Sequence, residues 1–322
     1  MRSSAGSPRR IRPRHKRKRP RGRRPRPRAA RRRRPAAAAS RPPFPSAAAA
    51  RGKMSASRIP PIPPMRIATW NVNSLNVRKQ HVLDWLAQSD VDVLCLQELK
   101  IPDEKFPREA LEAAGYRSWF AGQKTYNGVA ILARASLPFD ETDIVRNIPG
   151  FEDAQQRLIA ATIDGVRIVS AYFPNGQALD SDKFVYKMQW LDALQAWLKD
   201  ELQRYPKLAL LGDYNIAPED RDVHDPAKWE GQNLVSPQER AHFAQLVALG
   251  FVDAFRRFEQ PEKTFTWWDY RMLAFRRNAG LRIDHILLSP ALAETCTSCT
   301  VDRVPRTWEQ PSDHTPVVAQ LG

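Results

Sequence analysis

Short, nearly continuous apolar segments recur along the chain, and such segments are typical of β-strands buried on both faces. Two of them, residues 158–163 and 166–173, are separated only by Asp164 and Gly165. This dipeptide favours a two-residue hairpin turn, so we predict an antiparallel hairpin here. The other predicted strands cover residues 66–72, 91–96, 128–133, 208–211, 283–288 and 315–321.

Other segments have the spacing of an amphipathic helix. Apolar residues recur every three or four positions between residues 182 and 204, which predicts one long helix. They are Phe184, Met188, Leu191, Leu194, Leu198 and Leu202. A shorter apolar stripe at residues 82–86 predicts a helix between the first two strands. Because hairpins are mixed with helices, we expect an α+β fold in which two mixed β-sheets pack face to face and helices flank them.

Charge divides the chain into two parts. Residues 1–64 contain 22 of the 51 lysine and arginine residues, 13 of the 27 prolines and no acidic residue. Residues 65–322 therefore carry 29 basic and 35 acidic residues, a net charge of −6, although the whole chain has +16. Since proline restricts the backbone and like charges repel, we expect residues 1–64 to be a disordered basic tail. Residues 65–322 are enough for one domain with a large core.

Three interpretations of the tail stay open. It could bind nucleic-acid phosphates, or it could direct import into an organelle. Import is the less favoured of these, because the prolines oppose the amphipathic helix that import requires. The tail could also be an upstream stretch that is not normally translated, since Met54 and Met65 are both plausible starts.

Composition also argues against two classes of protein. Three cysteines, Cys95, Cys296 and Cys299, are too few for a disulfide scaffold. Cys296 and Cys299 have CxxC spacing, but no matching ligands lie nearby in sequence, so we interpret the pair as incidental. None of the apolar runs reaches the roughly 18 uncharged residues of a membrane span, so we expect no membrane partner.

Polar side chains lie at the ends of four predicted strands. A single such residue is usually a turn residue or a helix cap, but strand ends at one rim of a sheet stack converge in space. We therefore expect the polar groups to share one pocket. They are Asn71, Glu98, Asp213, Asn215, Asp313 and His314. An oxygen-rich set without thiolates suits a hard cation, Mg²⁺ or in its place Mn²⁺, so these six residues are the candidate metal ligands.

These segments resemble exonuclease III and the apurinic/apyrimidinic endonucleases of the DNase I-like (endonuclease/exonuclease/phosphatase) superfamily. The resemblance spans residues 66–321 in the family's order and does not cover the tail. Its motifs are IATWNVNS (67–74), LQE (96–98), NGVA (127–130), YFPNG (172–176), GDYNIAP (212–218), TWWDY (266–270), GLRID (280–284) and SDH (312–314). The resemblance implies a DNase I-like four-layer α/β sandwich over residues 65–322.

The resemblance also implies roles for individual residues. Glu98 would be the principal metal carboxylate, with Asn71 and Asp313 near the ion. Tyr172 and Asn215 would contact the phosphate. His314 would lie on the scissile phosphate, with its other ring nitrogen held by Asp284.

The general base is left open between Asp213 and His314. We favour Asp213 as the group that orients and deprotonates the attacking water. The reason is that a histidine paired with a carboxylate is better suited to stabilise charge than to accept a proton.

Substrate-binding residues follow from the same resemblance. Trp267, Trp268 and Leu281 would wall an apolar pocket for a flipped-out deoxyribose that lacks its base. Adjacent tryptophans can instead face opposite sides of a strand, and we favour Trp268 over Trp267 for the pocket. Asn175 is a further candidate DNA contact, although it could simply make a turn.

The implied function is a Mg²⁺-dependent DNA repair nuclease. It would hydrolyse the phosphodiester 5′ to abasic sites in double-stranded DNA and trim blocked 3′ ends, with 3′→5′ exonuclease action. Two alternatives stay open: another metal-dependent phosphoesterase of the superfamily, and a catalytically inactive DNA-binding relative. We expect a cytoplasmic monomer that acts on nucleoid DNA.

Overall fold

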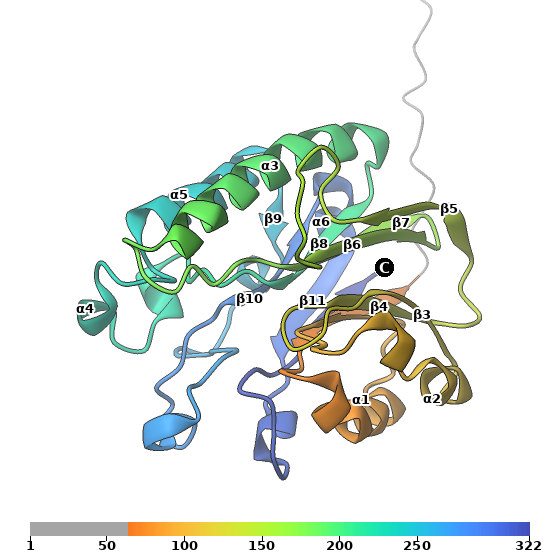
Figure 1. Cartoon of the computed structure of the whole chain (residues 1–322), viewed down its shortest axis with the longest axis horizontal. Coiled ribbons are helices and arrows are strands. Elements are labelled where there is room, and N and C mark those ends of the chain that lie inside the picture. The colour runs from red at the N-terminus through yellow and green to blue at the C-terminus, as the bar shows by residue number, and fades with distance from the viewer. Residues whose placement is uncertain (1–63) are drawn as a thin grey trace, which may run out of the picture. The chain divides into compact units, whose positions relative to one another are not determined.

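Two six-stranded β-sheets pack face to face in the computed structural model, which describes residues 64–322 (Figure 1). The predicted tail therefore lies outside the described residues, apart from Pro64. The first sheet has the order β11 (Cys296–Val301), β12 (Val317–Leu321), β1 (Met65–Asn71), β2 (Val93–Gln97), β4 (Val129–Arg134), β3 (Tyr116–Ala121). The second has the order β5 (Phe139–Arg146), β6 (Leu158–Ile163), β7 (Val166–Tyr172), β8 (Leu208–Asp213), β10 (Asp284–Leu288), β9 (Val252–Asp253).

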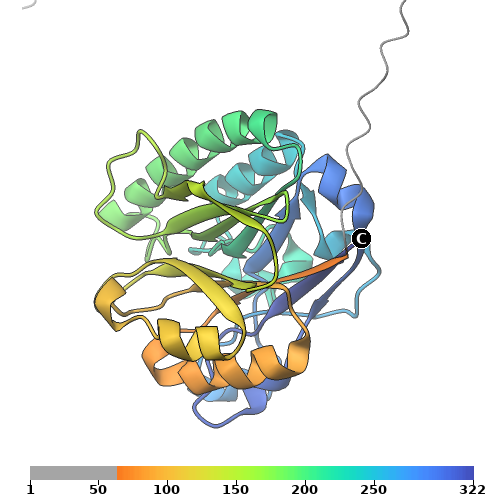
Figure 2. The same cartoon turned by 90° about the vertical axis from the view of Figure 1, so that its right-hand side faces the viewer.

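Helices cover the outer faces of both sheets, as the two views show (Figures 1 and 2). Against the first sheet lie α1 (Leu75–Ser89) and α2 (Arg108–Ala113), and against the second lie α3 (Asp182–Arg204) and α5 (Pro237–Ala248). The shorter helices are α4 (Pro226–Trp229), α6 (Pro290–Thr295) and the 3₁₀ turns η1 (Asp103–Lys105), η2 (Asp220–Asp222), η3 (Phe255–Arg257), η4 (Arg271–Leu273) and η5 (Val304–Thr307). The layers are thus helix, sheet, sheet and helix, which confirms the expected four-layer sandwich.

Three buried apolar clusters hold these layers together. The first lies between the sheets and includes Ile67 and Ile131 from one sheet and Ile168 from the other. The second joins the outer face of the second sheet to α3 and α5, and the third joins the outer face of the first sheet to α1 and α2. Both faces of each sheet are therefore buried, which explains why the strands appear in the sequence as continuous apolar runs.

The strongest local signals in the sequence are confirmed. Strands β6 and β7 form the predicted hairpin, and Asp164 and Gly165 both have positive φ (47° and 73°), as a two-residue hairpin turn requires. Helix α3 has the predicted bounds and begins after Ser181, whose side chain accepts a hydrogen bond from the amide of Phe184.

Several elements carry no such signal and were not predicted. Edge strand β5 is one of them, because most of its residues are exposed or half-buried. Strand β11 is another, and it contains both cysteines of the CxxC spacing. A register shift between Cys296 and Ser298 lets Cys296 and Cys299 both face the core as free thiols. Within residues 64–322, none of the helices has the length and apolar character to cross a membrane.

Sheet pairing determines where polar groups meet. Strands β1 and β2 are parallel, as are β7 and β8, so their carboxyl ends lie together. In the register of the strands, Tyr172 is opposite Asp213, and Asp213 is also opposite Asp284. The strand ends of both sheets therefore converge on one rim of the sandwich.

Candidate active site

Asn71 joins the two sheets at this rim. It is the last residue of β1 and is fully buried. Its side-chain nitrogen Nδ2 donates hydrogen bonds to Glu98 Oε1 (2.9 Å) and to Asp213 Oδ2 (2.8 Å). One buried amide therefore fixes the distance between two carboxylates from different sheets.

The backbone turns sharply where it leaves the strands. Asn73, Glu98 and Asn215 have φ values of 45°, 53° and 50°, in the left-handed region that residues other than glycine rarely adopt. Such conformations persist where the surrounding structure holds them, and they are concentrated at functional sites. Before the turn at Asn215, β8 passes so close to β7 that a Cβ on Gly212 would lie 1.8 Å from the carbonyl oxygen of Ala171.

Among residues 64–322, Glu98, Asp213 and His314 form a group with the geometry to hold a metal ion. Each offers one ligand atom, and these atoms all lie within 4.8 Å of one another. Carboxylates without a thiolate suit a hard cation, so the residues present fit Mg²⁺ or Mn²⁺. Lys100, which the sequence did not reveal, lies 2.7 Å from Glu98 Oε2 and partly balances its charge.

His314 lies between two carboxylates. Its Nδ1 is 2.9 Å from Asp284 Oδ2, as the resemblance implies, and its Nε2 is 3.6 Å from Asp213 Oδ2. Burial disfavours the charged ring, but the carboxylates of Asp284 and Asp213 outweigh it and raise the pKa of His314 to about 10. The ring is therefore an imidazolium at neutral pH in this arrangement.

The same surroundings also raise the pKa of Asp213, but here burial is the largest cause. Burial raises its pKa, the His314 charge lowers it, and the nearby Asp284 and Glu98 raise it again, to a pKa of about 7. A carboxyl group with a pKa near the working pH is suited to accept a proton.

Tyr172 ends β7 beside these carboxylates. Burial, followed by the negative charges of Glu98 and Asp213, raises the pKa of its phenol well above the ordinary value. The hydroxyl group therefore stays protonated and can donate a hydrogen bond. The guanidinium of Arg157, a residue that the sequence analysis did not single out, lies 4.8 Å from the centre of the Tyr172 ring.

Asn215 and Asn175 form a pair next to Asp213. Asn175 Nδ2 donates to Asn215 Oδ1 (2.9 Å), while Asn215 Nδ2 donates to the carbonyl oxygen of Phe173 (3.1 Å). The backbone nitrogen of Asn215 also donates a hydrogen bond to Asp213 Oδ1 (2.9 Å). The side-chain oxygen of Asn215 is therefore occupied by Asn175, so in this conformation it does not present a metal ligand.

Asp313 lies apart from the three-residue group among the described residues. Its oxygens accept hydrogen bonds from Asn73 Nδ2 (2.8 Å) and Trp267 Nε1 (3.0 Å). The resemblance implies a place near the ion for Asp313. The structure gives it a place in the wall of the site, where it orients Trp267.

The structure reverses the roles that the sequence favoured for the two adjacent tryptophans. Trp268 is fully buried, it packs with Phe265 and Ala274, and its Nε1 donates to Asn278 Oδ1 (3.2 Å). It cannot wall a substrate pocket in this conformation, so the preference for Trp268 is corrected. Leu281 is also fully buried and lies behind Trp267. Neighbouring residues of an extended segment face opposite sides, so Trp267 faces the site.

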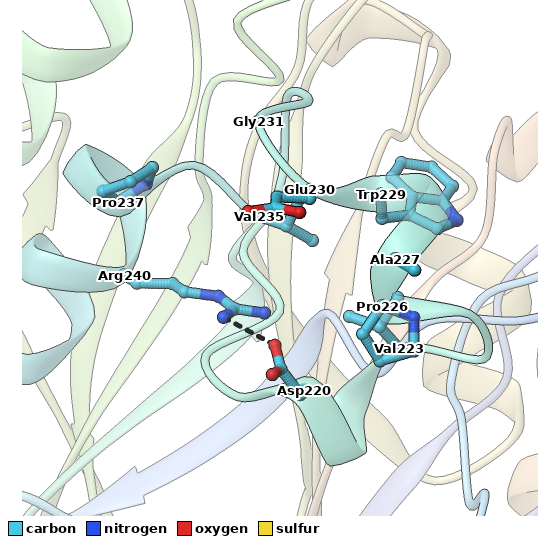
Figure 3. A pocket seen from close by; sticks show the side chains of 10 residues that line it. All are labelled: Asp220, Val223, Pro226, Ala227, Trp229, Glu230, Gly231, Val235, Pro237 and Arg240. Atoms are coloured by element: carbon cyan, nitrogen blue, oxygen red, sulfur yellow. Dashed lines mark hydrogen bonds and ion pairs between the residues drawn. The ribbon is translucent and has the colours of Figure 1, made fainter.

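Trp267 lines a hollow of about 660 Å³ together with Asn175, Trp229 and Arg271. A second hollow, of about 510 Å³, is lined by residues of α4 and of the loop after it, and it shares Trp229 and Gly231 with the first. Figure 3 shows this second hollow, which the ion pair of Arg240 and Asp220 crosses. It contains none of the predicted site residues. A third hollow, of about 670 Å³, is lined by Tyr172, Asn175 and Arg157, so this hollow and the first one both adjoin the candidate chemistry.

Comparison with known proteins agrees with this geometry. Residues 68–314 match the endonuclease/exonuclease/phosphatase family. Exodeoxyribonuclease III of Haemophilus influenzae is 35% identical over 273 residues, which cover 80% of this chain and 100% of that protein.

Two solved structures have the same fold. A 3′ phosphatase from Neisseria bound to a product DNA hairpin is 47% identical, with a TM-score of 0.78 over 80% of this chain and 99% of that one. An AP endonuclease from Archaeoglobus fulgidus is 37% identical, with a TM-score of 0.76 over the same shares of the two chains.

Proposed function

This chain belongs to the endonuclease/exonuclease/phosphatase family and is a DNA repair nuclease of the exodeoxyribonuclease III type, and we propose that it hydrolyses phosphodiesters 5′ to abasic sites and trims blocked 3′ ends. The observation that carries the proposal is the group formed by Glu98, Asp213 and His314, with Asp284 behind the histidine. We further propose that the protein is a monomer and acts on double-stranded nucleoid DNA in the cytoplasm.

Glu98 would hold the ion, with Asp213 and the side chain of Asn71 beside it. When bound, Mg²⁺ would supply positive charge next to the phosphate that is cleaved. The carboxylates of Glu98 and Asp213 fit that ion because their oxygens lie close together, whereas the protonated ring of His314 offers no ligand atom at neutral pH.

Asp213 would orient the attacking water and remove its proton. His314 is the weaker candidate for this role, since with a pKa of about 10 it already carries its proton at neutral pH. The imidazolium would instead stabilise the negative charge that builds on the phosphoryl oxygens, with the hydroxyl group of Tyr172 and the amide of Asn215 as further donors. The complete set of groups argues against an inactive relative.

A nuclease assay on two matched substrates tests the proposal. One duplex would carry a single abasic site and the other a nick with a 3′-phosphate, each with EDTA, with Mg²⁺ and with Mn²⁺. We expect cleavage of both with either metal and no cleavage in EDTA, and Asp213→Asn serves as the inactive control. Full activity in excess EDTA would refute the metal site. Removal of 3′-phosphate without incision at the abasic site would limit the enzyme to 3′ ends.

A further inference from the structure

A fully buried lysine lies directly behind the candidate site. Lys187 is on α3, in the inner stripe between Phe184 and Leu191, and its side chain has 0% exposure. Its ammonium group donates hydrogen bonds to the carbonyl oxygens of Asn215 (2.8 Å) and Asn175 (3.2 Å). The third partner is the carboxylate of Glu239, so all three N–H groups of the lysine are used.

Glu239, on α5, is equally buried and connects a further loop to this network. Its Oε1 also accepts a hydrogen bond from the amide of Leu234 (3.1 Å). Its Oε2 accepts from the amide (3.0 Å) and the hydroxyl group (2.7 Å) of Ser236, the residue that caps α5. The ion pair therefore ties two helices to the loop that leads into α5 and to the loops that follow β7 and β8.

The two carbonyl groups that Lys187 holds belong to the asparagines of the site. The side chains of Asn175 and Asn215 are hydrogen-bonded to each other, and Asn233 Nδ2 also donates to Asn175 Oδ1 (3.0 Å). The turn after Asn175 packs on the stem of the lysine, because a Cβ on Gly176 would lie 3.1 Å from Lys187 Cδ. The network therefore fixes the backbone of both asparagines from the buried side.

Stability alone does not explain this arrangement. Taking two charges out of water costs free energy that their attraction often fails to recover, and well-packed apolar residues would serve a core as well. A lysine in the apolar stripe of α3 is therefore informative, because its ammonium is the one group there that can hold two carbonyl oxygens at once.

We propose that Lys187, held by Glu239, is a positioning residue that fixes Asn175 and Asn215 for the attack on the phosphate. It acts through two backbone carbonyls and touches no substrate. The inference rests on the proposed roles of these two asparagines. It predicts that loss of the ammonium lowers the rate of the chemical step much more than it weakens DNA binding.

The chain offers a matched control at the far end of the same helix. Arg167 of β7 and Glu201 of α3 form a second buried ion pair, with 2.9 Å between Nε and Oε2. The test variant is Lys187→Met with Glu239→Gln, and the control is Arg167→Met with Glu201→Gln. Both remove one buried ion pair, and the control also takes from Asp143 the partner that Arg167 provides (3.3 Å), so we expect both to lower the melting temperature. Each protein is assayed for turnover at saturating substrate on the 3′-phosphate duplex.

We expect kcat to fall roughly 10–100-fold in the test variant, with little change in KM, because small displacements of reacting groups have effects of this size. The control should stay within about twofold, less than 0.5 kcal/mol of barrier. Unchanged kcat in the test variant, or equal losses in test and control, would overturn the proposal. If the test variant does not fold, Glu239→Gln alone, which keeps the shape of the side chain, is judged by the same comparison with Glu201→Gln.

A double-mutant cycle separates positioning from general damage. Lys187→Met should cost much less in an Asn215→Ala background than in the wild type, because one of the two side chains that it positions is already gone. Independent, multiplying losses would overturn the proposal. Full activity of Asn215→Ala on its own would refute the proposed role of Asn215, and this inference would fall with it. If Asn215→Ala is inactive but Lys187→Met keeps its activity, the proposed role of Asn215 stands and only the inference about Lys187 fails.

Discussion

Removing each of the two adjacent tryptophans should have opposite consequences. Trp268 is fully buried, and a tryptophan of this kind removes about 150–250 Å² from water, worth roughly 4–6 kcal/mol at ~25 cal/mol per Å². The hydrogen bond from Nε1 to Asn278 adds about 1 kcal/mol. Because such areas overstate burial relative to real unfolded chains, we expect Trp268→Ala to cost about 3–5 kcal/mol of unfolding free energy.

Trp267→Ala should cost less stability and more activity. The side chain is half-buried, lines the hollow beside the site and holds Asp313 through its Nε1. We expect it to lower kcat/KM on an abasic duplex by roughly 10–100-fold, the usual effect of misplaced substrate contacts. Removal of a 3′-phosphate, which does not fill the hollow, should fall less.

Urea unfolding and kinetics on both substrates would be measured for the two variants in parallel. Trp268→Phe is the control, because it keeps an aromatic ring in the core and should recover most of the stability. Wild-type stability in Trp268→Ala would show that the side chain is not packed as described. A larger selective loss on abasic DNA in Trp268→Ala than in Trp267→Ala would restore the assignment that the sequence favoured.

The fold could be predicted because its signals are local. A strand covered on both faces needs a continuous apolar run, and the turn of the β6–β7 hairpin needs two residues that tolerate positive φ, as Asp164 and Gly165 do. The order of motifs then identified the sandwich. Strands β3, β5 and β11 lack such signals, since much of their surface faces water and neighbouring strands decide their pairing.

The site could be predicted only where the type of a residue and its position near a strand end were enough to assign its role. Glu98 follows β2, Asp213 ends β8 and His314 precedes β12. The parallel pairs β1–β2 and β7–β8 and the antiparallel pair β1–β12 bring them together. Which tryptophan faces the hollow depends on the bridge between Trp267 and Leu281, a contact between distant segments that no local pattern encodes. Lys187 did leave a signal, because it interrupts the apolar stripe of α3, but a single lysine there is usually read as a surface residue.

The remaining predictions concern the catalytic pair and a buried histidine. Asp213→Asn should bind an abasic duplex like the wild type but turn over roughly 10²–10⁴-fold more slowly; a loss below tenfold in single-turnover assays would move the base elsewhere. Asp284→Asn should lower kcat about 10–150-fold, because a charge-assisted hydrogen bond to His314 is worth about 1.5–3 kcal/mol. The comparison is Asp253→Asn, which changes a carboxylate that pairs with Arg282 instead of with His314. The last prediction is acid sensitivity through His285. Burial, and then the charge of Arg282, lowers the pKa of His285 to about 4, whereas the unfolded value is near 6.5. Between these values the unfolded chain binds more protons than the folded one, so stability is fully present above about pH 6.5 and is lost as pH falls toward 4. A shift of this size corresponds to about 3 kcal/mol. Urea unfolding at pH 7.5, 5.5 and 4.5 should show that loss in the wild type and a smaller one in His285→Gln. Parallel curves for the two proteins would mean that His285 is not the group that titrates.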